Sequence, residues 1–158
     1  MILKGLIDTD SINYKKICMV LEFPICKGFK CDRECGQQVC QNSALATAPN
    51  IEVEPIDLIS RYENNGMTEA VCCQGLEPFD SWADLYTFIK LFRSVSDDDI
   101  VIYTGYTKCE ILDKVTLLKE VTNIIIKFGR YIPNQTPHYD EVLGVDLASD
   151  NQYAERIC

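Results

Sequence analysis

The chain has little histidine, no long apolar run and no surplus of basic residues. His138 is the only histidine, so the sequence offers no Ser-His-Asp arrangement. No apolar stretch approaches the roughly 20 residues that cross a bilayer. The net charge of −9 leaves no general cationic attraction for nucleic acid or anionic membranes. We therefore expect a protein that binds neither nucleic acid nor membranes.

Two sequence patterns with a defined role are also missing. The N-terminal MILKGLIDTD does not join a charged region to a long apolar one, as a secretory signal does. No phosphate-binding P-loop is present. We expect a cytoplasmic protein with reduced thiols, and under those conditions clustered cysteines favour a metal over disulfides.

The 158 residues have an ordinary globular composition, with 47% hydrophobic and 25% charged residues, which fits a single domain over 1–158. Apolar runs alternate with segments of helical periodicity. The pattern predicts strands at 16–23, 69–73, 100–103 and 123–128, and helices at 55–64, 82–95 and 107–118. Strands that alternate with helices predict an α/β fold with a parallel sheet.

Cysteine is abundant and clustered. Four of the nine cysteines lie in CKGFKCDRECGQQVC, directly after the first expected strand: Cys26, Cys31, Cys35 and Cys40. Four, three and four residues separate them, so the paired C-x2-C knuckles typical of zinc sites are absent. An iron–sulfur cluster also takes thiolates and is the favoured metal, with zinc as the alternative.

Several other conspicuous residues have simpler interpretations. We expect buried core thiols at Cys18, Cys72 and Cys109, a frayed terminal thiol at Cys158, an exposed loop histidine at His138 and a solvated acidic turn at 97–99. A calcium site at 97–99 is disfavoured because the ligand spacing of a calcium loop is missing.

Three loops follow expected strands. The cysteine loop leaves the first, residues 74–78 (QGLEP) leave the second, and residues 104–107 (TGYT) leave the third. Because the carboxyl ends of parallel strands meet at one edge of a sheet, these loops should face one pocket.

The order of these segments resembles a known family. The most specific of them are CQNS at 40–43, GLEP at 75–78, IYTGY at 102–106 and SDNQ at 149–152. Together they resemble the radical S-adenosylmethionine superfamily. Within it, the chain is most similar to the small activating enzymes of anaerobic ribonucleotide reductase, from about Asp8 to the C-terminus.

The resemblance implies an open parallel (β/α) partial barrel with a [4Fe–4S] cluster at the carboxyl edge of the strands. The family pattern is C-x3-C-x2-C, followed by an aromatic residue and often Asn. This chain has a longer loop, and Gln41-Asn42 resembles that ending. The implied ligands are Cys26, Cys31 and Cys40, with Cys35 as a rival third ligand or a fourth.

The resemblance also implies a site for S-adenosylmethionine. The turn that contains Gly75, Glu77 and Pro78 resembles the motif that contacts the methionyl amino group, and Thr104 and Gly105 would line the adenosine or methionine part. The alternatives are a solvated turn acid at Glu77 and a simple strand-ending turn at 104–105. Asn151 and Gln152 are expected at the pocket rim.

The implied function is a radical S-adenosylmethionine oxidoreductase that works without air. Such an enzyme cleaves S-adenosylmethionine reductively and installs a glycyl radical on a partner such as anaerobic ribonucleotide reductase. It takes its electron from a small donor such as flavodoxin or ferredoxin. A noncatalytic iron–sulfur or zinc-binding interaction module of the same fold is the alternative.

Overall fold

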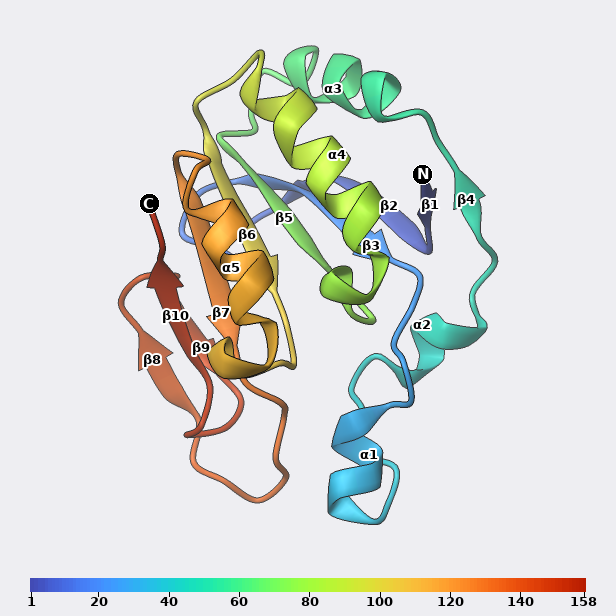
Figure 1. The fold of residues 1–158 in the computed structure, drawn as a ribbon, viewed down its shortest axis with the longest axis vertical. Coiled ribbons are helices and arrows are strands. Elements are labelled where there is room, and N and C mark those ends of the chain that lie inside the picture. The colour runs from blue at the N-terminus through green and yellow to red at the C-terminus, as the bar shows by residue number, and fades with distance from the viewer.

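The computed structural model describes residues 1–158 and is an α/β fold built on one mixed sheet (Figure 1). The sheet has six strands in the order β10-β7-β6-β5-β3-β2. In chain order these are β2 (Gly5–Asp10), β3 (Cys18–Phe23), β5 (Ala70–Gly75), β6 (Asp99–Tyr103), β7 (Ile124–Phe128) and β10 (Tyr153–Arg156). The four central strands are parallel, and the edge strands β2 and β10 pair antiparallel.

Helices cover one face of this sheet (Figure 1). They are α3 (Pro55–Glu63), α4 (Trp82–Arg93) and α5 (Leu112–Leu118), with the 3-10 helices η1 (Pro78–Ser81) before α4 and η2 (Lys108–Ile111) before α5. In α4 the buried side chains recur every three or four residues, which is the period of a helix with one apolar face: Leu85, Phe88, Ile89 and Phe92. None of the helices has the length and apolar character that a membrane span requires.

The core lies on both faces of the sheet because alternate strand residues point to opposite sides. Ile124, Ile126 and Phe128 of β7 pack toward the helices, whereas Ile125 packs in a smaller cluster on the other face. Tyr14 and the C-terminal segment close that second face. By the same alternation, Lys127 lies on the face away from the helices.

Four short strands and two short helices complete the chain. Strand β1 (Ile2–Leu3) pairs with β4 (Ile51–Glu52), and β8 (His138–Asp140) pairs with β9 (Val145–Leu147). Two short helices, α1 (Lys30–Cys35) and α2 (Ser43–Thr47), lie between β3 and β4. Neither helix has a buried residue, so neither belongs to the core.

The predicted strands and helices are all present, and the α/β class is confirmed. The expectation of a purely parallel sheet is wrong at the edges, where β2 and β10 run antiparallel. The segment at 16–23 is also not the first strand, because Gly5–Asp10 precedes it as β2. The helix predicted at 107–118 begins with a 3-10 turn before α5.

The simpler residue interpretations have mixed outcomes. Cys18 and Cys72 are fully buried, as expected. Cys109 is exposed in the short helix η2, whose one buried residue is Ile111, and the prediction of a core thiol is wrong there. Cys158 is exposed, although its sulfur contacts the carbonyl oxygens of two residues in the chain. His138 is half-buried within β8 instead of lying in an exposed loop.

The prediction of a solvated acidic turn at 97–99 is wrong at Asp99, whereas Asp97 is exposed as expected. Asp99 is 5% exposed and lies at the start of β6. The carboxylate accepts hydrogen bonds from Tyr14 Oη at 2.9 Å and Lys16 Nζ at 2.7 Å, and it pairs with Arg156 Nη2 at 2.8 Å. Burial raises the pKa of Asp99, but these hydrogen bonds outweigh it and hold the pKa below the ordinary 3.8. Asp99 therefore ties β6 to the segments before β3 and in β10.

Replacing Asp99 by Asn should lower the free energy of unfolding at pH 7 by about 1–3 kcal/mol, because the charged acceptor shared by three donors is lost. The carboxyl pKa of Asp99 is lower in the folded chain than in the unfolded chain. The stability that Asp99 contributes is therefore present at neutral pH and is lost as the pH falls below 3.8. Urea unfolding at several pH values measures it. Asp97→Asn, at an exposed neighbour, is the control; equal effects of the two substitutions would contradict the account.

Candidate functional site

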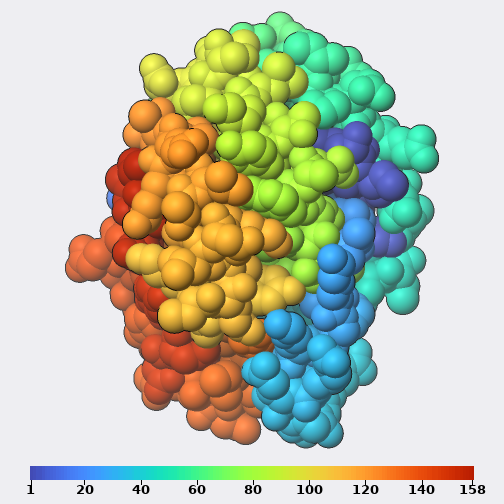
Figure 2. Space-filling view, in the orientation of Figure 1, coloured from blue at the N-terminus to red at the C-terminus, as the bar shows by residue number.

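A cavity of about 310 Å³ opens at the carboxyl ends of the parallel strands. Its walls come from the loops after β3, β5, β6 and β7 and from the segment around β9. Figure 2 shows the cysteine-loop segment at the lower end of the molecule, beside segments of the C-terminal third. The prediction that the loops after the strands meet at one edge is therefore confirmed.

Gly75 ends β5 in a conformation that requires glycine. Its φ is +103°, and a Cβ atom there would approach the backbone nitrogen of Phe23 to 2.6 Å. The absence of a side chain lets β5 end tightly against β3. The Asn42 side-chain amide donates to the Gly75 carbonyl oxygen at 2.7 Å, so the far end of the cysteine loop is fastened to this turn.

Glu77 joins the end of β5 to the end of β6. Its Oε1 accepts from Thr104 Oγ1 at 2.7 Å and from the Phe79 amide at 3.2 Å, and its Oε2 accepts from the Gly105 amide at 2.9 Å. Burial raises the pKa of Glu77 to about 7, against the opposing effect of these hydrogen bonds. At 5% exposure Glu77 is not a solvated turn acid, and the 104–105 turn is held by it.

Of the other residues predicted to contact the cofactor or to lie at the pocket rim, some line the cavity and others do not. Thr104 and Gly105 line the cavity, but Pro78 does not: it is buried in η1, where it starts the turn that leads into α4. Gln152 lines the cavity, and its side chain donates to the Gly129 carbonyl oxygen at 3.3 Å. Asn151 is exposed and lies outside the lining.

Lys127 is a cavity residue that the sequence argument missed. It is the register partner of Tyr103 in the parallel pair β6–β7, and it is 6% exposed. Its ammonium donates to the Gly129 carbonyl oxygen at 2.8 Å, and no carboxylate forms an ion pair with it. Burial lowers its pKa to about 8, while the nearby charge of Glu77 opposes that shift. The sequence did contain a signal for this residue, since Lys127 interrupts the apolar run NIIIKF. Lysines are rarely buried unless they are paired, so a lysine in a buried strand indicates a special role.

Three of the four loop cysteines line the cavity, namely Cys26, Cys31 and Cys40, and Cys35 does not. Asp32 folds the loop, because its Oδ1 accepts from the amides of Val39 and Cys40 at 2.7 Å each. This brings Cys40 to Cys31. Burial, together with the charge and hydrogen bond of Cys40, raises the pKa of the Cys31 thiol to about 11.

The sulfurs share the cavity without forming a closed ligand set. No group of three or more His, Cys, Asp or Glu side chains converges closely enough to hold a metal ion. Burial is also the main reason that the pKa of Cys26 is raised. Cys26 and Cys31 are therefore protonated at neutral pH, and a metal bound by them would displace their protons and draw the loop inward.

Comparison with known proteins does not add to this description. No protein-family model, curated protein or solved structure matches the chain.

The raised pKa of Glu77 predicts a pH dependence of stability. Between the ordinary 4.5 and about 7 the folded chain holds a proton that the unfolded chain has lost. The stability contributed by this proton is present at low pH and is lost as the pH rises through about 7, a decline on the order of 2–3 kcal/mol. Glu77→Gln should remove this decline, as measured by urea unfolding from pH 4.5 to 7.5. Parallel profiles for the variant and the parent would contradict the assignment.

Proposed function

We propose that this protein is a radical S-adenosylmethionine enzyme with a fold of the open partial-barrel type. One observation carries the proposal: Cys26, Cys31 and Cys40 line the same cavity as the Glu77 turn. The three thiols precede Glu77 by 37 to 51 residues in the chain, and parallel strand pairing brings them to one sheet edge. Chance placement on unrelated parts of the surface would leave them without a common cavity.

The three cysteine thiols of the cavity are of the chemical type that binds a [4Fe–4S] cluster. Thiolates are the ligands that iron–sulfur clusters take, and the cavity supplies three cysteines from one loop. Asp32, the nearest carboxylate in the loop, is occupied by the amides that shape it. Cys35 lies outside the lining, which leaves three cysteines as the proposed ligands. When bound and reduced, such a cluster supplies the single electron that cleaves S-adenosylmethionine to methionine and a 5′-deoxyadenosyl radical.

The opposite wall fits the methionine end of S-adenosylmethionine. Glu77 offers a carboxylate for an ammonium group. Its raised pKa of about 7 would fall when a cation binds beside it, which favours the ionised form. Lys127 offers an ammonium with donors to spare for a carboxylate. When a cation beside Glu77 keeps it ionised, the two side chains carry opposite charges inside one cavity and together match an amino-acid zwitterion.

The chain's own residues orient the ligand and limit the access of water. Thr104 and Gly105 are fixed by their hydrogen bonds to Glu77, so this wall is preorganised. The proposed product is a glycyl radical on a partner such as anaerobic ribonucleotide reductase, in the cytoplasm. A small reductant such as flavodoxin or ferredoxin would supply the electron.

Single cysteine replacements test the proposal. After anaerobic reconstitution with iron and sulfide, Cys26→Ala, Cys31→Ala and Cys40→Ala should each lose most bound iron and nearly all 5′-deoxyadenosine formation with dithionite. Cys35→Ala should keep both, because its thiol is outside the cavity. Iron, sulfide and 5′-deoxyadenosine per chain are measured, with the exposed Cys109→Ala as the control.

Two outcomes would contradict this assignment. If the Cys40 variant kept its cluster and the Cys35 variant lost it, the third ligand would be Cys35. If the parent protein bound iron or zinc but formed no 5′-deoxyadenosine, the chain would be the noncatalytic metal-binding module.

Lys127→Gln tests the carboxylate contact. The amide can still donate to the Gly129 carbonyl oxygen but carries no charge, so we expect S-adenosylmethionine to bind the reconstituted protein about 10-fold more weakly. Isothermal titration calorimetry without air measures the affinity. Lys119→Gln, at an exposed position on the helical side, is the control. Unchanged affinity in the Lys127 variant would remove Lys127 from the ligand site.

A further inference from the structure

The middle of the cysteine loop is held without any core packing. Helix α1 carries Cys31 and Cys35, and it has no buried residue. Its flanking residues Phe29 and Gly36 both have left-handed backbones, with φ of 42° and 66°, so the chain turns sharply at both ends of the helix. Apolar burial therefore does not fix where α1 lies.

The two ends of the loop are fastened to the same side of the cavity. The Lys27 amide donates to Asp80 Oδ2 in η1, and the Asn42 side chain donates to the Gly75 carbonyl oxygen at the end of β5. These contacts fix the residues before and after the loop. They do not decide how far α1 reaches across the cavity toward β6 and β7.

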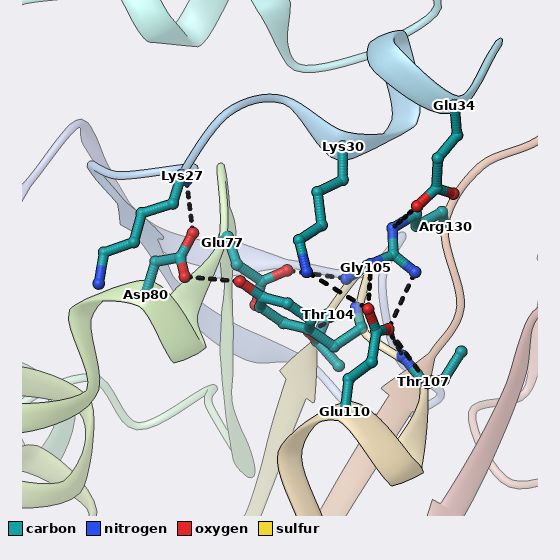
Figure 3. A network of polar contacts seen from close by, with 11 residues as sticks. Lys27, Lys30, Glu34, Glu77, Asp80, Thr104, Gly105, Thr107, Glu110 and Arg130 are labelled. Atoms are coloured by element: carbon teal, nitrogen blue, oxygen red, sulfur yellow. Dashed lines mark hydrogen bonds and ion pairs between the residues drawn. The ribbon is translucent and has the colours of Figure 1, made fainter.

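Four charged side chains connect α1 to that far side, and we call them the α1 clasp: Lys30, Glu34, Glu110 and Arg130 (Figure 3). Lys30 Nζ lies 3.3 Å from Glu110 Oε1, and Glu34 Oε1 lies 3.4 Å from Arg130 Nε. Lys30 and Glu34 are one helical turn apart, so they project from one side of α1. Lys30 and Glu34 thus each contact a side chain of opposite charge on the far side of the cavity.

The partners of α1 are themselves rigidly placed. Arg130 Nη1 and Nη2 donate to both oxygens of Glu110 at 2.9 and 2.6 Å, which is a bidentate pair. Glu110 also accepts from the amide and hydroxyl of Thr107 at the start of η2. Arg130 is only 11% exposed, and these contacts hold the pKa of Glu110 near 2. The far side of the clasp is therefore a fixed, fully charged platform.

The platform also has an aromatic component. Lys30 Nζ lies 4.4 Å from the centre of the Tyr106 ring, and the Arg130 guanidinium lies 5.8 Å from it. Tyr106 Oη in turn donates to Asp80 Oδ1 at 2.8 Å. Tyr106 thus links Lys30 to Asp80, the η1 residue that also accepts from the Lys27 amide at the beginning of the loop.

We propose that Arg130 and Glu110 are positioning residues of the cysteine loop. Through Lys30 and Glu34 they hold α1 across the cavity, so that Cys31 faces the cavity and Cys35, one turn farther along, stays outside. The clasp thereby selects which thiols are presented to a metal. This role rests on the proposed function for the identity of the metal, but the selection of thiols is a property of the metal-free protein.

Thiol labelling of the metal-free protein tests the clasp. N-ethylmaleimide is added without air, and the rate at each cysteine is followed by peptide mass spectrometry. Lys30→Gln with Glu34→Gln removes both contacts on α1 by changing only surface side chains. We expect the Cys31-to-Cys35 rate ratio to rise about two- to fivefold, the scale that exposed ion pairs support. Arg130→Gln should act alike, and Arg130→Lys should restore most of the parent ratio.

Two controls separate the clasp from a general loss of charge. Lys108→Gln breaks a comparable exposed pair with Glu155, at 2.8 Å between η2 and β10, and should leave the ratio unchanged. Added salt at about 1 M should shift the parent protein toward the ratio of the double variant, because it screens exposed pairs. An unchanged ratio in the double variant, or an equal change in the Lys108 variant, would overturn the proposal.

The outcome is independent of the reaction. If labelling changes as expected but the reconstituted protein forms no 5′-deoxyadenosine, the clasp stands and the proposed function fails. If 5′-deoxyadenosine forms but the double variant labels like the parent, the function stands and the clasp is wrong.

Discussion

The parallel pairing of β3, β5, β6 and β7 is the constraint on which the site depends. Parallel hydrogen bonding places the carboxyl ends of these four strands side by side. A loop with polar groups follows each of these ends. The Glu77 carboxylate then fastens two of these ends together through Thr104 and Gly105. Without this pairing, the thiols, the buried acid and the buried amine would lie on unrelated parts of the chain.

The central part of the fold was predictable because buried parallel strands are continuous apolar runs and the helices have a clear period. The edge strands were not, since GLIDTD in β2 and YAER in β10 mix polar and apolar residues and take their place only by pairing with β3 and β7. Edge strands face solvent on one side, so their sequences need no continuous apolar pattern.

The site was predictable in its thiols and in the Glu77 turn, but not in its charges. Outside the site, Asp99 at the start of β6 shows the same limit: it looked like part of a solvated run, and its burial follows from partners in distant segments, Tyr14 and Arg156. Lys127 is similar: only the register with β6 places it at the cavity. Local patterns reveal which residues are polar, whereas burial and charge pairing depend on contacts between segments far apart in the chain.

The balance between rigid and loosely held parts is what the two proposed ligands of the cavity would require. The wall with Glu77 and Thr104 is buried and hydrogen-bonded, so it suits recognition of a small polar molecule. The cysteine loop has no buried residue in its helix and is held by surface charges, so its thiols can move toward a metal. Although the chain is acidic overall, three positive groups lie at the loop and the cavity wall: Lys27, Lys30 and Arg130.

In the proposed function, three cysteines hold an iron–sulfur cluster with one iron free for S-adenosylmethionine. Electron paramagnetic resonance of the anaerobically reconstituted, dithionite-reduced protein tests it most directly, with spectra recorded before and after S-adenosylmethionine is added. We predict the signal of a reduced [4Fe–4S] cluster and a clear change of that signal on addition. Bound zinc in place of iron, or a cluster signal that S-adenosylmethionine leaves unaltered, would contradict the account.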